Sequence, residues 1–207
     1  MSSACRAKDS IRKIFDRFLG ESQIFCYLLR ETKADERKGY FFMPTKNLLV
    51  NVDLSSVKRD YAWYTVTTLF NCEESYIRNL KESIDGLGIA PYFKECYIPI
   101  QYVKKDGKVK KLKGDFSRYV FVKCILTAKV WNLLRTTSGA AVVLTTGGVP
   151  VEVSDREIDS IRAETAPVGL DPQEEQELRE RLIQEYRYKG FKKPVVTDED
   201  FNTDFTT

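Results

Sequence analysis

The residue types that carry most acid–base and metal chemistry are absent or scattered in this sequence. Its 207 residues include no histidine, which excludes Ser–His and Cys–His catalytic pairs and histidine metal ligands. The five cysteines lie far apart with no CxxC pair, so a zinc site is not expected, and their scatter is typical of buried thiols in a reducing compartment. We therefore expect a cytoplasmic, non-catalytic protein without a metal or cofactor.

The most concentrated charge in the sequence is a group of lysines around a predicted hairpin turn, Asp106–Gly107. The six lysines are Lys104, Lys105, Lys108, Lys110, Lys111 and Lys113. A flexible basic finger with little acid nearby could contact nucleic acid, with a strong dependence on salt. The alternative is a solvated loop that its lysines simply keep soluble.

A second polar group follows a predicted short helix and consists of Arg135, Thr136, Thr137 and Ser138. An arginine with neighbouring hydroxyls can hold the phosphates or bases of a single strand. The competing interpretation is structural, because Arg135 would meet the helix dipole and Gly139 would supply the turn that ends the helix.

The elements that must position these groups alternate between strand and helix. The patterns predict strands over residues 63–69, 93–102, 116–124 and 140–144. Helices are predicted after capping residues Asn71, Thr127 and Ser154. This order, with one hairpin, favours an α+β fold in which helices flank a four-stranded antiparallel sheet.

The first predicted helix has a clear apolar face. Its members recur at helical spacing and are Tyr76, Ile77, Leu80, Ile84 and Leu87. Gly86 and Gly88 are expected to end the helix.

Charge and pattern divide the chain into three parts. Residues 1–58 hold eleven basic and seven acidic side chains, residues 59–164 hold sixteen and thirteen, and residues 165–207 hold six and ten. We expect an N-terminal extension of unassigned role, a central domain, and a tail in which a charged helix from Gln173 to about Tyr188 precedes a disordered end. No apolar run reaches the length of a membrane-spanning helix, so no membrane partner is expected.

Residues 61–164 resemble the N-terminal domain of the NusG family of transcription elongation factors. The motifs that carry the resemblance are Trp63-Tyr64-x-Val66, Tyr97-Ile98-Pro99 before the lysine hairpin, Phe116-x-x-Tyr119-Val120-Phe121-Val122, Trp131-x-x-x-Arg135-x-Thr137-x-Gly139, and Gly147 to Ile158. Two features depart from the family. Ser117-Arg118 stands where the family commonly has Pro-Gly, and no second β-barrel domain with the KOW motif is recognisable after Thr165.

The resemblance implies a non-catalytic elongation and antitermination factor that binds multisubunit RNA polymerase across the DNA cleft and modulates processivity and pausing. An exposed aromatic depression made of Trp63, Phe116 and Tyr119, with Arg118 at its edge, would bind the clamp helices of the β′ subunit. The residues alone favour sheet core for the three aromatics; the resemblance favours the surface for Phe116 and Tyr119 and leaves both interpretations open for Trp63.

The remaining partners also follow from the resemblance. The group from Arg135 to Ser138 would approach the non-template DNA strand at the upstream edge of the bubble, or the gate loop of the β subunit. A ribosomal protein or Rho is expected only if a KOW domain exists beyond this chain. The alternative function is an RNA- or single-strand-binding module that places Tyr64 or Phe121 on an open sheet face.

Overall fold

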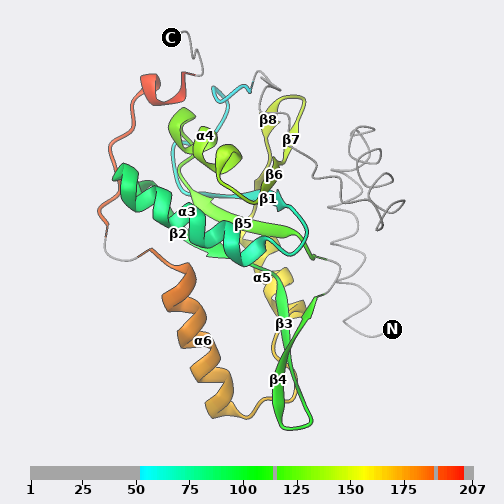
Figure 1. Ribbon diagram of the computed structural model, residues 1–207. Coiled ribbons are helices and arrows are strands. Elements are labelled where there is room, and N and C mark those ends of the chain that lie inside the picture. The colour runs from blue at the N-terminus through cyan, green and yellow to red at the C-terminus, as the bar shows by residue number, and fades with distance from the viewer. Residues whose placement is uncertain (1–51, 114–115, 189–190, 203–207) are drawn as a thin grey trace. The chain divides into compact units, whose positions relative to one another are not determined.

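The fold is an antiparallel sheet with helices packed against it, as the computed structural model shows for residues 52–113, 116–188 and 191–202 (Figure 1). The N-terminal extension predicted over residues 1–58 therefore lies outside the described residues up to residue 51. In chain order, the elements are β1 (Ala62–Thr68), α3 (Glu73–Leu87), η1 (Ala90–Tyr92), β2 (Phe93–Tyr97), β3 (Ile100–Lys105), β4 (Lys108–Lys113), β5 (Tyr119–Cys124), α4 (Ala128–Thr136), β6 (Ala140–Val143), β7 (Thr145–Thr146), β8 (Val149–Pro150), β9 (Glu152–Val153), α5 (Asp155–Glu164), α6 (Pro172–Tyr186) and η2 (Asp198–Phe201).

Strand β1 is the centre of the main sheet, whose order is β2-β5-β1-β6, with β9 also pairing with β1. All seven residues of β1 are buried. Tyr64 and Val66 join one continuous apolar core with side chains of α3 and α4. Trp63 points to the opposite face, because successive side chains of a strand alternate, and there it meets α5. The predicted α+β class and antiparallel sheet are confirmed.

The helix signals were largely sufficient, with three exceptions at α3. Gly88 ends this helix as predicted, but Gly86 lies within it. Thr127 caps α4 and Ser154 forms a capping box with Glu157, both as predicted. The predicted cap by Asn71 is wrong: Asn71 has a φ of +59° and α3 begins after Cys72. Asparagine tolerates this left-handed conformation, which the sharp turn from β1 into α3 requires. Leu87, expected on the buried face, is 50% exposed at the end of the helix.

The predicted strand over residues 93–102 is two strands. Strand β2 belongs to the main sheet, whereas β3 leaves it and forms a separate hairpin with β4. Pro99 lies at the break because it has no N–H to donate to a continuous ladder. The hairpin turn at Asp106–Gly107 is confirmed, with φ of +56° and +72°, the two positive values of a type I′ turn.

The tail has more structure than expected. Helix α6 begins with a capping box between Asp171 and Glu174, and the predicted charged helix is confirmed. Disorder was predicted beyond Gly190, but residues 191–202 include the 3-10 turn η2, and Phe201 is buried in the apolar core. Burial of this large aromatic side chain contributes to holding the short, polar stretch in place. Among the described helices, none is long and apolar enough to cross a membrane.

Gly139 and Gly86 make a matched pair of glycine substitutions. Gly139 has a φ of +97°, and an added Cβ would lie 3.3 Å from the Cβ of Tyr76, whereas nothing lies within 4 Å of a Cβ at Gly86. We expect Gly139→Ala to lower the free energy of unfolding by more than about 1 kcal/mol, because it adds both strain and a close contact. Gly86→Ala is expected to raise it by about 0.5 kcal/mol, since alanine favours the helix. Urea unfolding measures both, and equal effects at the two positions would contradict this account.

Candidate functional site

The end of β1 is joined to the turn that precedes β5. The backbone N–H of Thr68 donates to the carbonyl of Arg118 at 2.7 Å, and Nε of Arg118 donates to the carbonyl of Thr68 at 3.1 Å. The backbone N–H of Arg118 also donates to Oε1 of Glu73 at 2.9 Å. Glu73 is the first residue of α3 and is itself buried. These bonds fix the Arg118 turn against the start of the helix.

Arg118 adopts a backbone conformation that normally belongs to glycine. Its φ is +79°, a region that costs a non-glycine residue roughly 1–2 kcal/mol. The family resemblance places glycine at this position, so Arg118 keeps the backbone shape and adds a side chain. The bonds to Thr68 and Glu73 hold the strained residue in place, and β5 begins after this turn, at Tyr119 rather than at the predicted Phe116.

The predicted exposed aromatic depression is only partly present. Trp63 is 2% exposed and Phe116 is 8% exposed, so the expectation that these two rings lie on the surface is wrong. Tyr119 and Arg118 are half-buried and reach the surface. An aromatic patch at this turn would therefore be narrow, with Phe116 supporting it from below.

Trp63 instead has a structural environment beneath α5. Its indole Nε1 donates to Oδ1 of Asp155 at 2.8 Å. The guanidinium of Arg162 and the ammonium of Lys123 each lie 5.5 Å from the ring centre, within cation–π range. The ring is thus enclosed by polar groups from β5 and α5.

The open aromatic sheet face of the alternative function is absent from the part of the chain that the structure describes. Tyr64 is fully buried and Phe121 is 3% exposed. Tyr64 packs in the core, and Phe121 stacks on Tyr97 with ring centres 6.2 Å apart. Neither ring can receive a base, so the predicted stacking platform is wrong.

The group at the end of α4 divides into buried and exposed members. Thr137 is buried and its hydroxyl donates to the carbonyl of Leu133 at 2.7 Å. The Thr136 hydroxyl donates to the carbonyl of Asn132 at 2.8 Å, although the residue is exposed. Arg135 donates from Nη2 to Oδ1 of Asn132 at 3.3 Å. The side chains of Arg135, Thr136 and Thr137 therefore form hydrogen bonds within the last turn of α4. Thr136 and Ser138 are the exposed members of the group.

Sequence reasoning missed Phe70, which is 75% exposed. It follows the end of β1 directly, between the Arg118 turn and the α4–β6 turn, because Leu69 N–H donates to the carbonyl of Gly139 at 2.9 Å. The available signal was a large apolar residue between a strand and an Asn-led turn, where no helix or strand face exists to bury it. We call this end of the sheet the junction surface and define it as Phe70, Arg118, Tyr119, Thr136 and Ser138.

The hairpin lysines separate onto two faces. Lys104 opposes Val109 and Lys111 opposes Tyr102, whereas Lys105 opposes Lys108 and Lys110 opposes Val103. Residues directly opposite in a pair share a face and neighbours along the strand alternate. One face therefore carries Lys104 and Lys111, and the other carries Lys105, Lys108 and Lys110. The sixth lysine, Lys113, opposes Ile100 at the base of the hairpin, and its side chain is outside those that the structure describes.

Acidic side chains neutralise the first of these faces. Nζ of Lys104 lies 2.7 and 2.8 Å from the two carboxylate oxygens of Glu174 on α6, and the hydrogen bond to Glu174 raises the pKa of Lys104. Lys111 forms an ion pair with Glu74 on α3. The expectation of little acid nearby is wrong for this face, because both acids come from segments distant in sequence.

The second face keeps its positive charge. Lys105 and Lys108 are exposed on either side of the turn, and Lys110 has only a 3.9 Å contact with Asp106. Like charges placed opposite one another weaken a hairpin, so this face has no structural reason to be basic.

Groups of three or more metal-ligating side chains are absent from the residues that the structure describes.

The Trp63 environment predicts a pH dependence of stability. Hydrogen bonds from Lys123 and Trp63 lower the pKa of Asp155 below its ordinary 3.8. The stabilisation is therefore fully present above pH 3.8 and is lost as the pH falls through the lower pKa of the folded protein. Tryptophan-monitored urea unfolding should show that Asp155→Asn loses less stability than the unaltered chain on acidification below this pH. An identical loss in both proteins would show that Asp155 contributes nothing.

Comparison with known proteins identifies relatives of the domain described above. Residues 61–162 match the family model described as "Transcription termination factor nusG". The "Transcription termination/antitermination protein NusG" of Rickettsia bellii is 28% identical over 121 residues, which cover 56% of this chain and 64% of that protein. The protein of the same name from Staphylococcus epidermidis is 34% identical over 80 residues, covering 37% and 44%.

A solved structure titled "Domain interaction in Thermotoga maritima NusG" is 29% identical, with a TM-score of 0.43, and the match covers 49% of this chain and 55% of that one. The chain thus spans less than two thirds of the length of each of these relatives. The family match spans β1 through most of α5 and includes the Arg118 turn and the lysine hairpin. Residues 61–162 of this chain are therefore a domain of the NusG family.

Proposed function

We propose that this chain is a non-catalytic transcription factor that binds multisubunit RNA polymerase across the DNA cleft and modulates processivity and pausing. The observation that carries the proposal is the match of residues 61–162 to the NusG family model. The matched range holds the whole main sheet and both groups of surface residues discussed above. A factor that binds a closed clamp more tightly than an open one shifts the polymerase toward the closed state.

The polymerase contact in this proposal is the Arg118–Tyr119 part of the junction surface, facing the β′ clamp helices. Phe116 lies just beneath it and is buried. Because backbone bonds to Thr68 and Glu73 already fix the Arg118 turn, little ordering would be lost on binding. Trp63 is not included, since α5 covers it.

Nucleic acid, in this proposal, meets the exposed residues on either side of that contact. Arg135, Thr136 and Ser138 would face the non-template strand or the β gate loop, with Phe70 beside them as an aromatic side chain on which a base can stack. The exposed hairpin face with Lys105, Lys108 and Lys110 would supply the electrostatic attraction. Rho and ribosomal proteins are not proposed as partners of this chain.

Binding to core RNA polymerase tests the clamp contact. The variant Arg118→Gly allows the left-handed turn, because glycine adopts positive φ freely. It removes the side chain together with its Nε bond to the Thr68 carbonyl, while the bonds of the residue 118 backbone to Thr68 and Glu73 can still form. We expect Arg118→Gly combined with Tyr119→Ala to weaken binding about tenfold, a loss of about 1.4 kcal/mol. Biolayer interferometry with immobilised polymerase measures the dissociation constants.

The control is Leu87→Ala, which removes an exposed apolar side chain at the far end of α3. It should bind as tightly as the unaltered chain, and circular dichroism should show both variants folded. If the unaltered chain does not bind core polymerase, the proposed function is wrong for this chain.

The two hairpin faces make a quantitative prediction about salt. For single-stranded nucleic acid, each phosphate contact contributes about 0.7 to the slope of log affinity against log salt. We expect Lys105→Gln with Lys108→Gln to reduce that slope by about 1.4 on a fluorescently labelled oligo-dT. Lys104→Gln should leave the slope nearly unchanged, because Glu174 already neutralises that ammonium. An equal change in both variants would show that the faces do not differ.

A further inference from the structure

The last described stretch of the chain runs back along the domain, and we call it the tail strap. It comprises residues 187–188 and 191–202, which follow α6 and end with η2 (Figure 1). Apart from η2 it has no helix, yet three different kinds of contact hold it to the body.

The first contact covers the free edge of β2. The other edge of β2 pairs with β5, and on the free side Glu95 forms an antiparallel bridge with Arg187. The N–H of Tyr188 donates to the carbonyl of Lys94 at 3.0 Å, and its ring lies 5.8 Å from that of Phe93. An uncovered strand edge is a template for pairing with another chain, so the strap closes a vulnerable side of the sheet.

The second contact is ionic. Lys193 lies 2.9 Å from Asp60, and Asp198 forms an ion pair with Arg59. The two body residues are adjacent and of opposite sign, and each meets its complement on the strap. All four side chains are solvent-exposed, so these pairs are weak and salt screens them.

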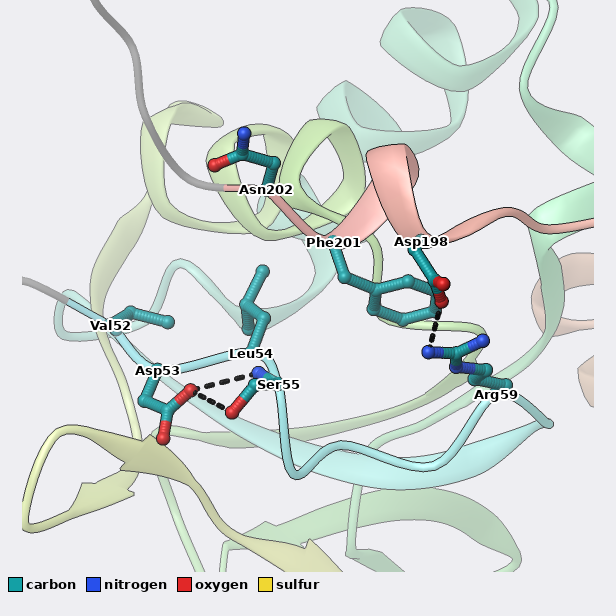
Figure 2. Close-up of a pocket in the computed structure, with 8 residues that line it drawn as sticks. All are labelled: Val52, Asp53, Leu54, Ser55, Arg59, Asp198, Phe201 and Asn202. Atoms are coloured by element: carbon teal, nitrogen blue, oxygen red, sulfur yellow. Dashed lines mark hydrogen bonds and ion pairs between the residues drawn. The ribbon is translucent and has the colours of Figure 1, made fainter.

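The third contact is a groove that receives Phe201. The ring is 8% exposed and lies between Leu54 and the guanidinium of Arg59, whose central carbon is 5.5 Å from the ring centre (Figure 2). Turn η2 also packs against α4. Arg59 thus binds two features of the same turn, the Asp198 carboxylate and the Phe201 ring.

Between these contacts the strap is loosely attached. Val195 is 89% exposed and Phe191 is 53% exposed. Few buried contacts and little regular structure are the features of a segment that opens without global unfolding. Tyr188 and Val196 also pack against the core, so the strap is held at these two side chains, at Phe201 and by its ion pairs rather than by continuous packing.

We propose that the tail strap is an intramolecular ligand of its own domain. The groove at Leu54, Arg59 and α4 is a recognition site for a segment that forms a 3-10 turn and carries a carboxylate three residues before an aromatic ring, here Asp198-x-x-Phe201 of η2. When this segment is bound, the strap closes the edge of β2. When it leaves, the groove and the strand edge open together, and both become available to a competing segment of the same chemistry. This surface is separate from the junction surface and does not depend on polymerase binding.

Amide hydrogen exchange of the full chain tests the coupling. Arg59→Asp and Asp198→Arg should each increase exchange of residues 187–202 and of the β2 edge about tenfold, while α3 stays protected, and the double swap should restore protection. Phe201→Ala should open both regions at any salt concentration, whereas Phe191→Ala, which removes an exposed ring, should not. If Phe201→Ala instead increases exchange throughout β1 and α3, the tail is an ordinary part of the core and the proposal is wrong.

Recognition is tested by adding the segment back. A synthetic peptide of residues 187–202 should bind the full-length Phe201→Ala chain and restore protection of β2, and the same peptide with Phe201→Ala should not. Absence of binding by the first peptide would overturn the proposed groove. Light scattering should show that the unaltered chain is a monomer. A dimer that Phe201→Ala dissociates would instead show that the strap binds between two copies, and the intramolecular assignment would be wrong.

Discussion

The pairing of β1 on both of its edges is the constraint on which this domain depends. A strand buried on both faces and bonded to β5, β6 and β9 can take only one register, since a shift by one residue would exchange Tyr64 and Val66 for Trp63 and Thr65 in the core. That register places Thr68 beside Arg118 and Leu69 beside Gly139. Three loops from distant parts of the sequence therefore meet at one end of the sheet, and the junction surface is a consequence of core packing.

The sequence was sufficient wherever a local signal agreed with the fold. Capping residues Thr127 and Ser154 and the Asp106–Gly107 turn act within a few residues, and all three lie where predicted. Predictions failed where distant segments decide. The burial of Trp63 depends on α5, and the order of residues 191–202 depends on a groove built more than a hundred residues earlier. No periodicity in either segment reports such contacts.

The charge of the hairpin is a second property that depends on contacts with distant segments. In the sequence its six lysines form one basic cluster, but strand alternation and two remote glutamates reduce it to one basic face. The total charge of the hairpin therefore does not show which face is positive. Glu174 on α6 and Glu74 on α3 pair with the lysines of one face, and the other face stays positive. Orientation of charge guides an approaching polyanion to one side of the hairpin more effectively than a uniformly basic loop would.

Val52 and Asn202 both line the pocket in Figure 2, so the first and last described residues of the folded body lie near one another. A covalent connection between them needs only a short linker and need not cross the sheet. The domain is accordingly suited to circular permutation, with new ends opened at the solvent-exposed Asp106–Gly107 tip, where few packing contacts would be cut. Such a permuted chain would keep every strand pairing of the main sheet while reversing which segments are synthesised first.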